Sequence, residues 1–180
     1  MEESSFLNPA GVISASHLHE GMFVADFGAG SGFFTRAAAR KVGEQGVVWA
    51  VDLEGPLLAR LKNMAAGENL LNVEVVQGDV SVVGGSHLPE GAFDLVIAAN
   101  ILFHIEEKYE LVAEARRILK KGGQVVAIDW TGSHGGLGPR EDHVVTRAQA
   151  EKLFEAQGFM IMRDVPAGPY HWGFVAKKKQ

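Results

Sequence analysis

The sequence contains no cysteine in its 180 residues. That absence excludes disulfide bonds, thiolate metal sites and a cysteine nucleophile. An excess of basic residues is also missing, because the net charge is −5 and the isoelectric point is near 5.8. Nucleic-acid binding needs a basic face, so a nucleic-acid partner is not expected. We interpret the run from Lys177 to Lys179 as a solvated tail.

Long apolar runs are missing as well. No stretch is apolar over the length that crosses a bilayer, and the N-terminus lacks the charged-then-apolar pattern of a leader. We therefore expect a cytoplasmic protein without a membrane partner. At this length we expect one domain over residues 1–180, with an N-terminal segment at 1–20 and a core at 21–177. Within the segment, Met1 to Phe6 is expected to be loose, and Pro9 favours a short helix at 10–19.

Glycine, by contrast, is concentrated at one informative place. Residues 22–27 are mostly apolar and predict a buried strand, and residues 33–42 have helical composition and spacing. Gly28, Gly30 and Gly32 lie between them. Glycine can turn the chain through backbone angles that other residues avoid, and it lets the main chain approach a ligand. The pattern predicts the first half of a nucleotide-binding βαβ unit; a purely structural turn is the alternative.

The rest of the chain alternates predicted strands and helices, which indicates an α/β fold. Further strands are predicted at 47–51, 72–77, 93–98, 124–128, 159–165 and 172–177, and further helices at 56–66, 108–120 and 147–157. Loops are expected at 81–91 and at 131–142, and the second is long enough to be a lid or a binding loop.

The spacing of the turn narrows the choice of nucleotide. A dinucleotide fingerprint would place its third glycine at residue 33, which is Phe33. The turn also lacks the Lys-Ser/Thr pair of a phosphate loop, which argues against ATP and GTP. Asp52 ends the second strand and can accept hydrogen bonds from ribose hydroxyls. That feature is shared by NAD enzymes and methyltransferases, and a surface Asp would look the same.

The segment Asp26-Phe-Gly-Ala-Gly-Ser-Gly32 resembles the first motif of class I S-adenosylmethionine-dependent methyltransferases. Asp52, Gly78-Asp-Val80, Phe93-Asp-Leu-Val and Leu119-Lys-Lys-Gly-Gly123 continue the resemblance, which looks closest to the small-molecule enzymes grouped with the quinone-biosynthesis C-methyltransferases. It implies S-adenosyl-L-methionine as cofactor and a small-molecule methyl acceptor. It also implies a Rossmann-like three-layer sandwich whose seven-stranded, mostly parallel sheet has the order 3-2-1-4-5-7-6, with strand 7 antiparallel.

The resemblance also implies roles for individual residues. By this resemblance, the glycine turn contacts the methionine part of the cofactor, the end of the second strand contacts the ribose, and the end of the third strand contacts the adenine. The end of the fourth strand lines the opening through which the methyl group is transferred. The corresponding residues are Asp26, Gly28, Ala29, Gly30 and Gly32; Asp52 and Leu53; Gly78, Asp79 and Val80; and Asn100. An Asp in a simple turn is the alternative for Asp79.

A general base is needed only if the acceptor must lose a proton during attack. His104, a few residues beyond the fourth strand, is the candidate; a packed or surface histidine is the alternative, and His143 and His171 are weaker candidates. Within the resembled fold, catechol-type enzymes hold Mg²⁺ with acids at the ends of the fourth and fifth strands. Here the fourth strand offers Asn100 and only Asp129 matches, so no metal is expected.

Three aromatic residues, Trp130, Tyr170 and Trp172, are candidates for an apolar wall that contacts the methyl acceptor, and packing in the core or on the surface is the alternative for them. Two rival functions also remain open at this point: a nicotinamide-dependent oxidoreductase, and a non-catalytic cofactor-binding module of the same fold. The oligomeric state does not follow from the sequence.

Overall fold

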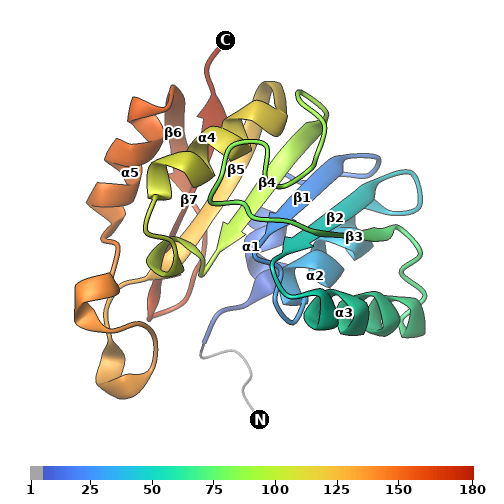
Figure 1. The fold of residues 1–180 in the computed structure, drawn as a ribbon, viewed down its shortest axis with the longest axis horizontal. Helices are drawn as coiled ribbons and strands as arrows, with labels where there is room; N and C mark the ends of the chain where they lie inside the picture. Colours follow the sequence, from blue (N-terminus) through green and yellow to red (C-terminus); the bar gives the residue numbers. More distant parts are fainter. Residues whose placement is uncertain (1–5) are drawn as a thin grey trace.

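The computed structural model describes residues 6–180, so the prediction for residues 1–5 lies outside the described chain. A seven-stranded sheet with the order β3-β2-β1-β4-β5-β7-β6 forms its centre (Figure 1). Strand β7 is antiparallel to both neighbours, and the pairings from β3 to β5 are parallel. The predicted fold class and strand order are confirmed. The strands are β1 (Phe23–Phe27), β2 (Val47–Asp52), β3 (Val73–Gln77), β4 (Phe93–Ala99), β5 (Leu119–Trp130), β6 (Phe159–Asp164) and β7 (His171–Lys178).

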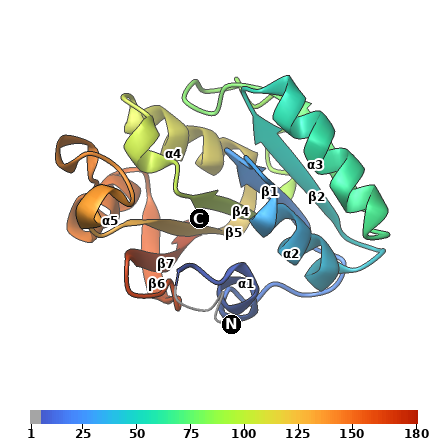
Figure 2. The ribbon, with the colours of Figure 1, turned by 90° about the horizontal axis from the view of Figure 1, so that it is seen from below.

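Helices cover both faces of the sheet and make three layers (Figure 2). Apolar side chains of the first three helices form one core cluster with one face of the sheet. Those of the last two form a second cluster with the opposite face. Burial on both faces explains the nearly continuous apolar runs of the central strands. The helices are α1 (Pro9–Ala15), α2 (Phe33–Val42), α3 (Gly55–Gly67), α4 (Lys108–Ile118) and α5 (Arg147–Ala156).

The predicted boundaries are wrong at two places in particular. Helix α1 ends at Ala15 rather than at residue 19, because His17 takes a left-handed backbone conformation with φ 59°. Helix α4 ends at Ile118, and β5 begins at Leu119 rather than at residue 124. Leu119 is fully buried and pairs with Phe93 at the start of β4, so the chain becomes extended earlier than the helical pattern indicates.

The carboxyl ends of β1, β2, β4 and β5 meet at one edge of the sheet, as parallel pairing requires. The segment that leads into α1 and the connection between β5 and α5 also lie at this edge (Figure 1). That connection contains two short 3₁₀ helices, His134–Gly136 and Glu141–His143. In open α/β sheets ligands bind at this edge. Over residues 6–180, no helix is both long and apolar enough to span a bilayer.

Candidate active site

The glycine turn between β1 and α2 has the backbone that only glycine adopts without strain. Gly28, Gly30 and Gly32 have φ of 68°, 51° and 75°, values that side-chain-bearing residues rarely take. A Cβ at Gly28 would lie 2.5 Å from Ile101 Cδ1. At Gly30, by contrast, the one heavy atom within 4 Å of such a Cβ, among residues 6–180 and apart from the adjacent residues, is the Gly28 carbonyl oxygen at 3.9 Å. The turn therefore presents bare main chain to open space at its tip.

Asp52 ties this turn to the end of β2. Its Oδ2 accepts a hydrogen bond from the Gly30 N–H at 2.9 Å, and its Oδ1 accepts one from the Glu54 N–H at 3.1 Å. The Asp52 carbonyl oxygen accepts a third from the Gly78 N–H at 3.0 Å. These bonds bring together three predicted site residues, Gly30, Asp52 and Gly78, which follow or end β1, β2 and β3. Leu53, next in the chain, is 63% exposed and leaves an apolar side chain open beside Asp52.

Asp79 closes the turn that follows β3. Its Oδ1 accepts hydrogen bonds from the N–H of Ser81 at 2.9 Å and from the hydroxyl of Ser81 at 2.5 Å. The Asp79 N–H donates to the Gly85 carbonyl oxygen at 2.9 Å, and Val80 is buried in the core. The local bonds are those of a turn Asp, and the predicted contact with adenine stays a prediction.

Glu114, which sequence reasoning missed, anchors the loop at 81–91. Its side chain is fully buried on α4, where its carboxylate accepts hydrogen bonds from the Gly84 N–H at 2.7 Å and the Arg117 Nε at 2.8 Å. The Ser86 hydroxyl donates to it as well. Burial acts to raise the pKa of Glu114, but the bonds from Arg117, Ser86 and Gly84 outweigh it, and the pKa is lowered. An ion pair between buried Glu114 and half-buried Arg117 therefore holds the segment that follows Asp79.

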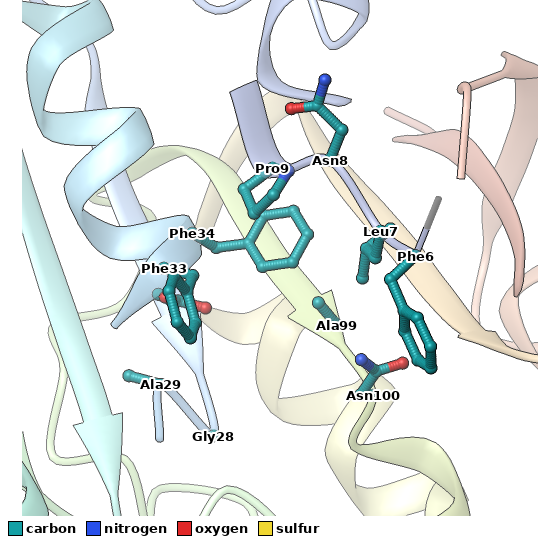
Figure 3. Close-up of a pocket in the computed structure, with 11 residues that line it drawn as sticks. Phe6, Leu7, Asn8, Pro9, Gly28, Ala29, Phe33, Phe34, Ala99 and Asn100 are labelled. Carbon is teal, nitrogen blue, oxygen red and sulfur yellow. The ribbon is translucent and has the colours of Figure 1, made fainter. Parts of the chain in front are cut away.

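A pocket of about 770 Å³ opens beside the glycine turn (Figure 3). Pockets that bind small molecules typically enclose roughly 300–1,000 Å³. The rings of Phe33 and Phe34 line one side, and Phe6 lies near Asn100 on another (Figure 3). The lining contains four of the predicted cofactor residues, Asp26, Gly28, Ala29 and Asn100, and seven residues that were not predicted, Phe6, Leu7, Asn8, Pro9, Phe33, Phe34 and Ala99.

Asp26 contributes a buried carboxyl group to this pocket. It is 2% exposed, and its Oδ2 accepts a hydrogen bond from the Thr35 hydroxyl at 2.6 Å. Burial raises its pKa to about 7, against the opposing effect of the Thr35 hydrogen bonds and with a small contribution from the carboxylate of Asp52. A cation bound in the pocket would favour the ionised form of this carboxyl.

Asn100 supplies an unpaired acceptor at the end of β4. Its N–H donates to the Ile128 carbonyl oxygen at 2.8 Å, and its backbone is left-handed, with φ 55°. Its side-chain Oδ1 is buried and has no hydrogen-bond partner within residues 6–180. Buried polar atoms without a partner are rare in folded proteins, so this oxygen suits a ligand that donates a hydrogen bond. Together with the glycine turn and Asp52, it fits a ribonucleoside cofactor that carries an amino group.

His104, the predicted base, does not line the pocket. It ends the short 3₁₀ helix Leu102–His104 and is exposed, with its ring centroid 3.8 Å from that of Phe103. Partial burial lowers its pKa, and proximity to His143 lowers it further. Its catalytic role stays a prediction.

Asp129 and the histidines do not form a metal cluster. Asp129 is fully buried and accepts N–H bonds from Trp130 at 2.8 Å and from Phe103 at 3.3 Å, so its carboxylate ties the end of β5 to the segment after β4. In the part of the chain that the structure describes, no group of three or more His, Asp or Glu side chains is arranged to hold a metal ion.

The three aromatic residues of the predicted acceptor wall divide between the two faces of the sheet. Trp172 points into the cluster under α4 and α5, where its Nε1 donates to the Val145 carbonyl oxygen at 2.8 Å. Trp130 and Tyr170 instead lie around Phe6, with ring centroids 5.9 and 5.3 Å from its ring. Only these two remain as candidates for an acceptor wall.

Comparison with known proteins decides the family. The family described as "Methyltransferase domain" matches residues 25–127, more than half of the chain. The chain belongs to this family. It is a class I S-adenosylmethionine-dependent methyltransferase domain, and the predicted family and cofactor are confirmed.

Curated and solved relatives agree with this assignment. The "Ubiquinone/menaquinone biosynthesis C-methyltransferase UbiE" of Neisseria meningitidis serogroup A is 28% identical over 160 residues, which cover 88% of this chain and 61% of that protein. The chain thus spans about 61% of that relative's length. A SAM-dependent methyltransferase from Aquifex aeolicus superposes with a TM-score of 0.85 and 27% identity, over 96% of this chain and 90% of the other. The [4+2]-cyclase SpnF shares the fold, with a TM-score of 0.78 at 17% identity over 94% of this chain and 80% of its own.

Proposed function

We propose that this methyltransferase domain transfers the methyl group of S-adenosylmethionine to a small organic molecule. The observation that carries the proposal is the pocket beside the glycine turn, whose lining combines the polar side chains of Asp26 and Asn100 with the rings of Phe6, Phe33 and Phe34. The polar groups suit a charged, hydrogen-bonding cofactor, and the aromatic rings suit an apolar acceptor.

The cofactor supplies an electrophilic sulfonium methyl group, so the task of the protein is chiefly alignment. Orientation of two reactants can contribute about 7–11 kcal/mol to a reaction. We assign Gly28, Gly30 and Gly32 to the methionine part, where bare main chain permits close approach. Asp52, which keeps acceptor capacity beyond its two N–H bonds, is assigned to the ribose hydroxyls.

Two further residues complete the proposed cofactor site. The unpaired Oδ1 of Asn100 accepts a hydrogen bond from an amino group, and Asp79 at the end of β3 binds the adenine amino group. Asp26 adds a negative charge beside a positively charged ligand once it ionises.

The proposed acceptor is small and largely apolar. The acidic balance of the chain, with a net charge of −5, does not suit a nucleic-acid acceptor. The UbiE relatives are named C-methyltransferases, so carbon is the atom at which transfer should be sought first. If that carbon must lose a proton, His104 is the proposed base. Because His104 is not among the residues that line the pocket, it could act only on an acceptor that extends beyond this lining.

Formation of S-adenosylhomocysteine from S-adenosylmethionine, measured across a panel of small acceptors, tests the proposal. Product that depends on the acceptor supports methyl transfer. Calorimetric binding of the cofactor without product from any acceptor would favour the non-catalytic module instead. Binding of NADH with no binding of S-adenosylmethionine would refute the proposal. Replacing His104 with Ala then tests the base: an unchanged kcat would remove it from catalysis.

A further inference from the structure

A second pocket lies at the edge of the sheet opposite to the candidate active site. We call it the amino-edge pocket, because the starts of β4 and β5 and the segment after α1 form it; its volume is about 260 Å³. In Figure 1 this edge carries the C-terminal end of β7 and lies away from the connection between β5 and α5. Leu95 near the start of β4 lines the amino-edge pocket, and Asn100, which follows that strand, lines the active-site pocket. The five residues from one to the other span roughly 17 Å of extended chain, so the two pockets are separate.

The sequence motif Leu119-Lys-Lys-Gly-Gly123 forms one wall of the amino-edge pocket. Between the points where Leu119 and Gln124 pair with β4, residues 120–123 lie opposite a single residue of that strand. These four residues therefore leave the regular ladder as a bulge, in which Gly122 has a φ of 73°. All four line the pocket. The bulge thus places two lysines and two glycines beside the pocket rather than in the sheet.

The charge around the amino-edge pocket is positive, although the protein as a whole is acidic. Lys120 is paired with Asp94, whose Oδ1 accepts a hydrogen bond from the Lys120 ammonium at 2.8 Å. Lys121 also lines the pocket, but it forms no ion pair within residues 6–180. Lys177, which has no ion pair in that part of the chain either, lies beside the bulge: a Cβ at Gly122 would be 3.5 Å from Lys177 Cε. Two positive charges are left without an acidic partner, and they attract an anion.

Gln124 provides an unpaired polar atom in the same pocket. The residue belongs to the pocket lining, and its side-chain Oε1 is buried without a hydrogen-bond partner among residues 6–180. Gln124 lies directly opposite Lys177 in the antiparallel pairing of β5 with β7. Side chains at such positions share one face of the sheet, with Cβ atoms roughly 5 Å apart. Because an unpaired buried acceptor is unfavourable, this oxygen suits a ligand that donates a hydrogen bond close to the cationic groups.

We propose that the amino-edge pocket binds a small organic phosphate that also carries a hydroxyl group. The phosphate is held by the ammonium groups of Lys121 and Lys177, and the hydroxyl donates its hydrogen bond to Gln124 Oε1. A phosphate with two negative charges matches two unpaired ammonium groups better than a carboxylate with one. The volume is below the roughly 300–1,000 Å³ of pockets for drug-sized ligands, so the ligand has a short carbon chain. This site is additional to the proposed methyl transfer and does not depend on it.

The test compares glycerol 3-phosphate with propyl phosphate, which has the same number of carbon atoms and no hydroxyl group. Both are titrated into the whole protein by calorimetry at pH 8, where both phosphates are dianionic. Glycerol 3-phosphate should bind roughly fivefold more tightly than propyl phosphate, as one hydrogen bond predicts. Glycerate, which keeps the hydroxyl groups but has a single negative charge, should bind more weakly than glycerol 3-phosphate. In NMR spectra, glycerol 3-phosphate should shift the backbone ¹⁵N signals of Gly122 and Gly123 and the side-chain amide signals of Gln124.

Three variants separate the two proposed contacts. Lys121→Gln should weaken the binding of both phosphates roughly tenfold, because it removes a charged hydrogen-bond donor. Lys152→Gln, at an exposed lysine on α5, is the matched control and should bind both as the wild type does. Gln124→Leu should leave the affinity for propyl phosphate unchanged and bring the ratio of the two affinities close to one.

An absence of glycerol 3-phosphate binding, an undiminished affinity in Lys121→Gln, or equally tight binding of glycerate would overturn the inference. If Gln124→Leu does not fold, the wild type decides: side-chain amide signals of Gln124 that glycerol 3-phosphate leaves unmoved refute the hydroxyl contact. Repeating the titration with S-adenosylhomocysteine present separates this site from the glycine turn. Phosphate binding that S-adenosylhomocysteine blocks would refute the amino-edge pocket, whereas failure of S-adenosylhomocysteine itself to bind would count against the proposed function alone.

Discussion

Replacing Asp26 with Asn should stabilise the protein without ligand, and the gain should grow with pH. Burial raises the pKa of Asp26 from 3.8 to about 7. Between pH 3.8 and pH 7 the Asp26 carboxyl group is protonated in the folded protein and ionised in the unfolded chain. The free energy of unfolding therefore falls as the pH rises. Above pH 7 the ionised carboxylate costs the fold roughly 4 kcal/mol relative to a neutral group. Asn has nearly the shape of the protonated acid and can still accept the Thr35 hydrogen bond.

The measurement is urea unfolding of both proteins, followed by circular dichroism, from pH 5 to pH 8. The difference in the free energy of unfolding should rise from roughly 1.5 kcal/mol at pH 5 to roughly 4 kcal/mol at pH 8. Glu155→Gln, which removes an exposed carboxylate on α5, is the control for the loss of one negative charge. A difference that stays constant with pH, or that grows in acid, would refute the assignment of a raised pKa to this group. The same substitution should weaken binding of the cationic cofactor at pH 8.

Two further predictions concern stability. Gly28→Ala, which places a Cβ 2.5 Å from Ile101 Cδ1 at a positive φ, should lower the free energy of unfolding by roughly 2 kcal/mol. The control is Gly67→Ala, at a site with open space, which should leave this free energy unchanged. Thermal unfolding measures both variants, and equal shifts of the melting temperature would contradict the argument. Glu114→Gln should cost about 3 kcal/mol at neutral pH because it leaves Arg117 without its buried partner. Since the pKa of Glu114 is lowered, this cost should shrink in acid below pH 4.5, and urea unfolding at pH 4 and pH 7 checks it.

The parts of the fold that could be predicted are those governed by local rules. The turn from Gly28 to Gly32 follows from backbone angles that only glycine takes easily, and the core face of α4 follows from helical periodicity. Asp52 could be placed at the site because a carboxylate that ends the second strand must lie at the edge where ligands bind. Each of these inferences needed only neighbours in sequence and a known direction of the chain.

The parts that could not be predicted depend on contacts between distant segments. Phe6 follows a polar stretch and has Leu7 as its one apolar neighbour in the sequence. Nothing in the sequence shows that it lines a pocket with residues of β1 and β4. The start of β5 at Leu119 is set by its pairing with Phe93, which overrides the helical pattern. The His171 ring is 5% exposed, and its two nitrogens have no hydrogen-bond partner among residues 6–180. This too is a property of its packing, and no spacing signal could have found it.

The measurement that bears most directly on the methyltransferase assignment is a calorimetric titration of S-adenosylmethionine into the wild type and into Asp52→Ala. Hydrogen bonds to a charged group contribute about 1.5–3 kcal/mol, so the wild type should bind and the variant should bind roughly 10- to 100-fold more weakly. Glu54→Ala, at the exposed neighbour on the same loop, should bind as the wild type does. A wild type that does not bind the cofactor, or an Asp52→Ala variant with undiminished affinity, would contradict the account.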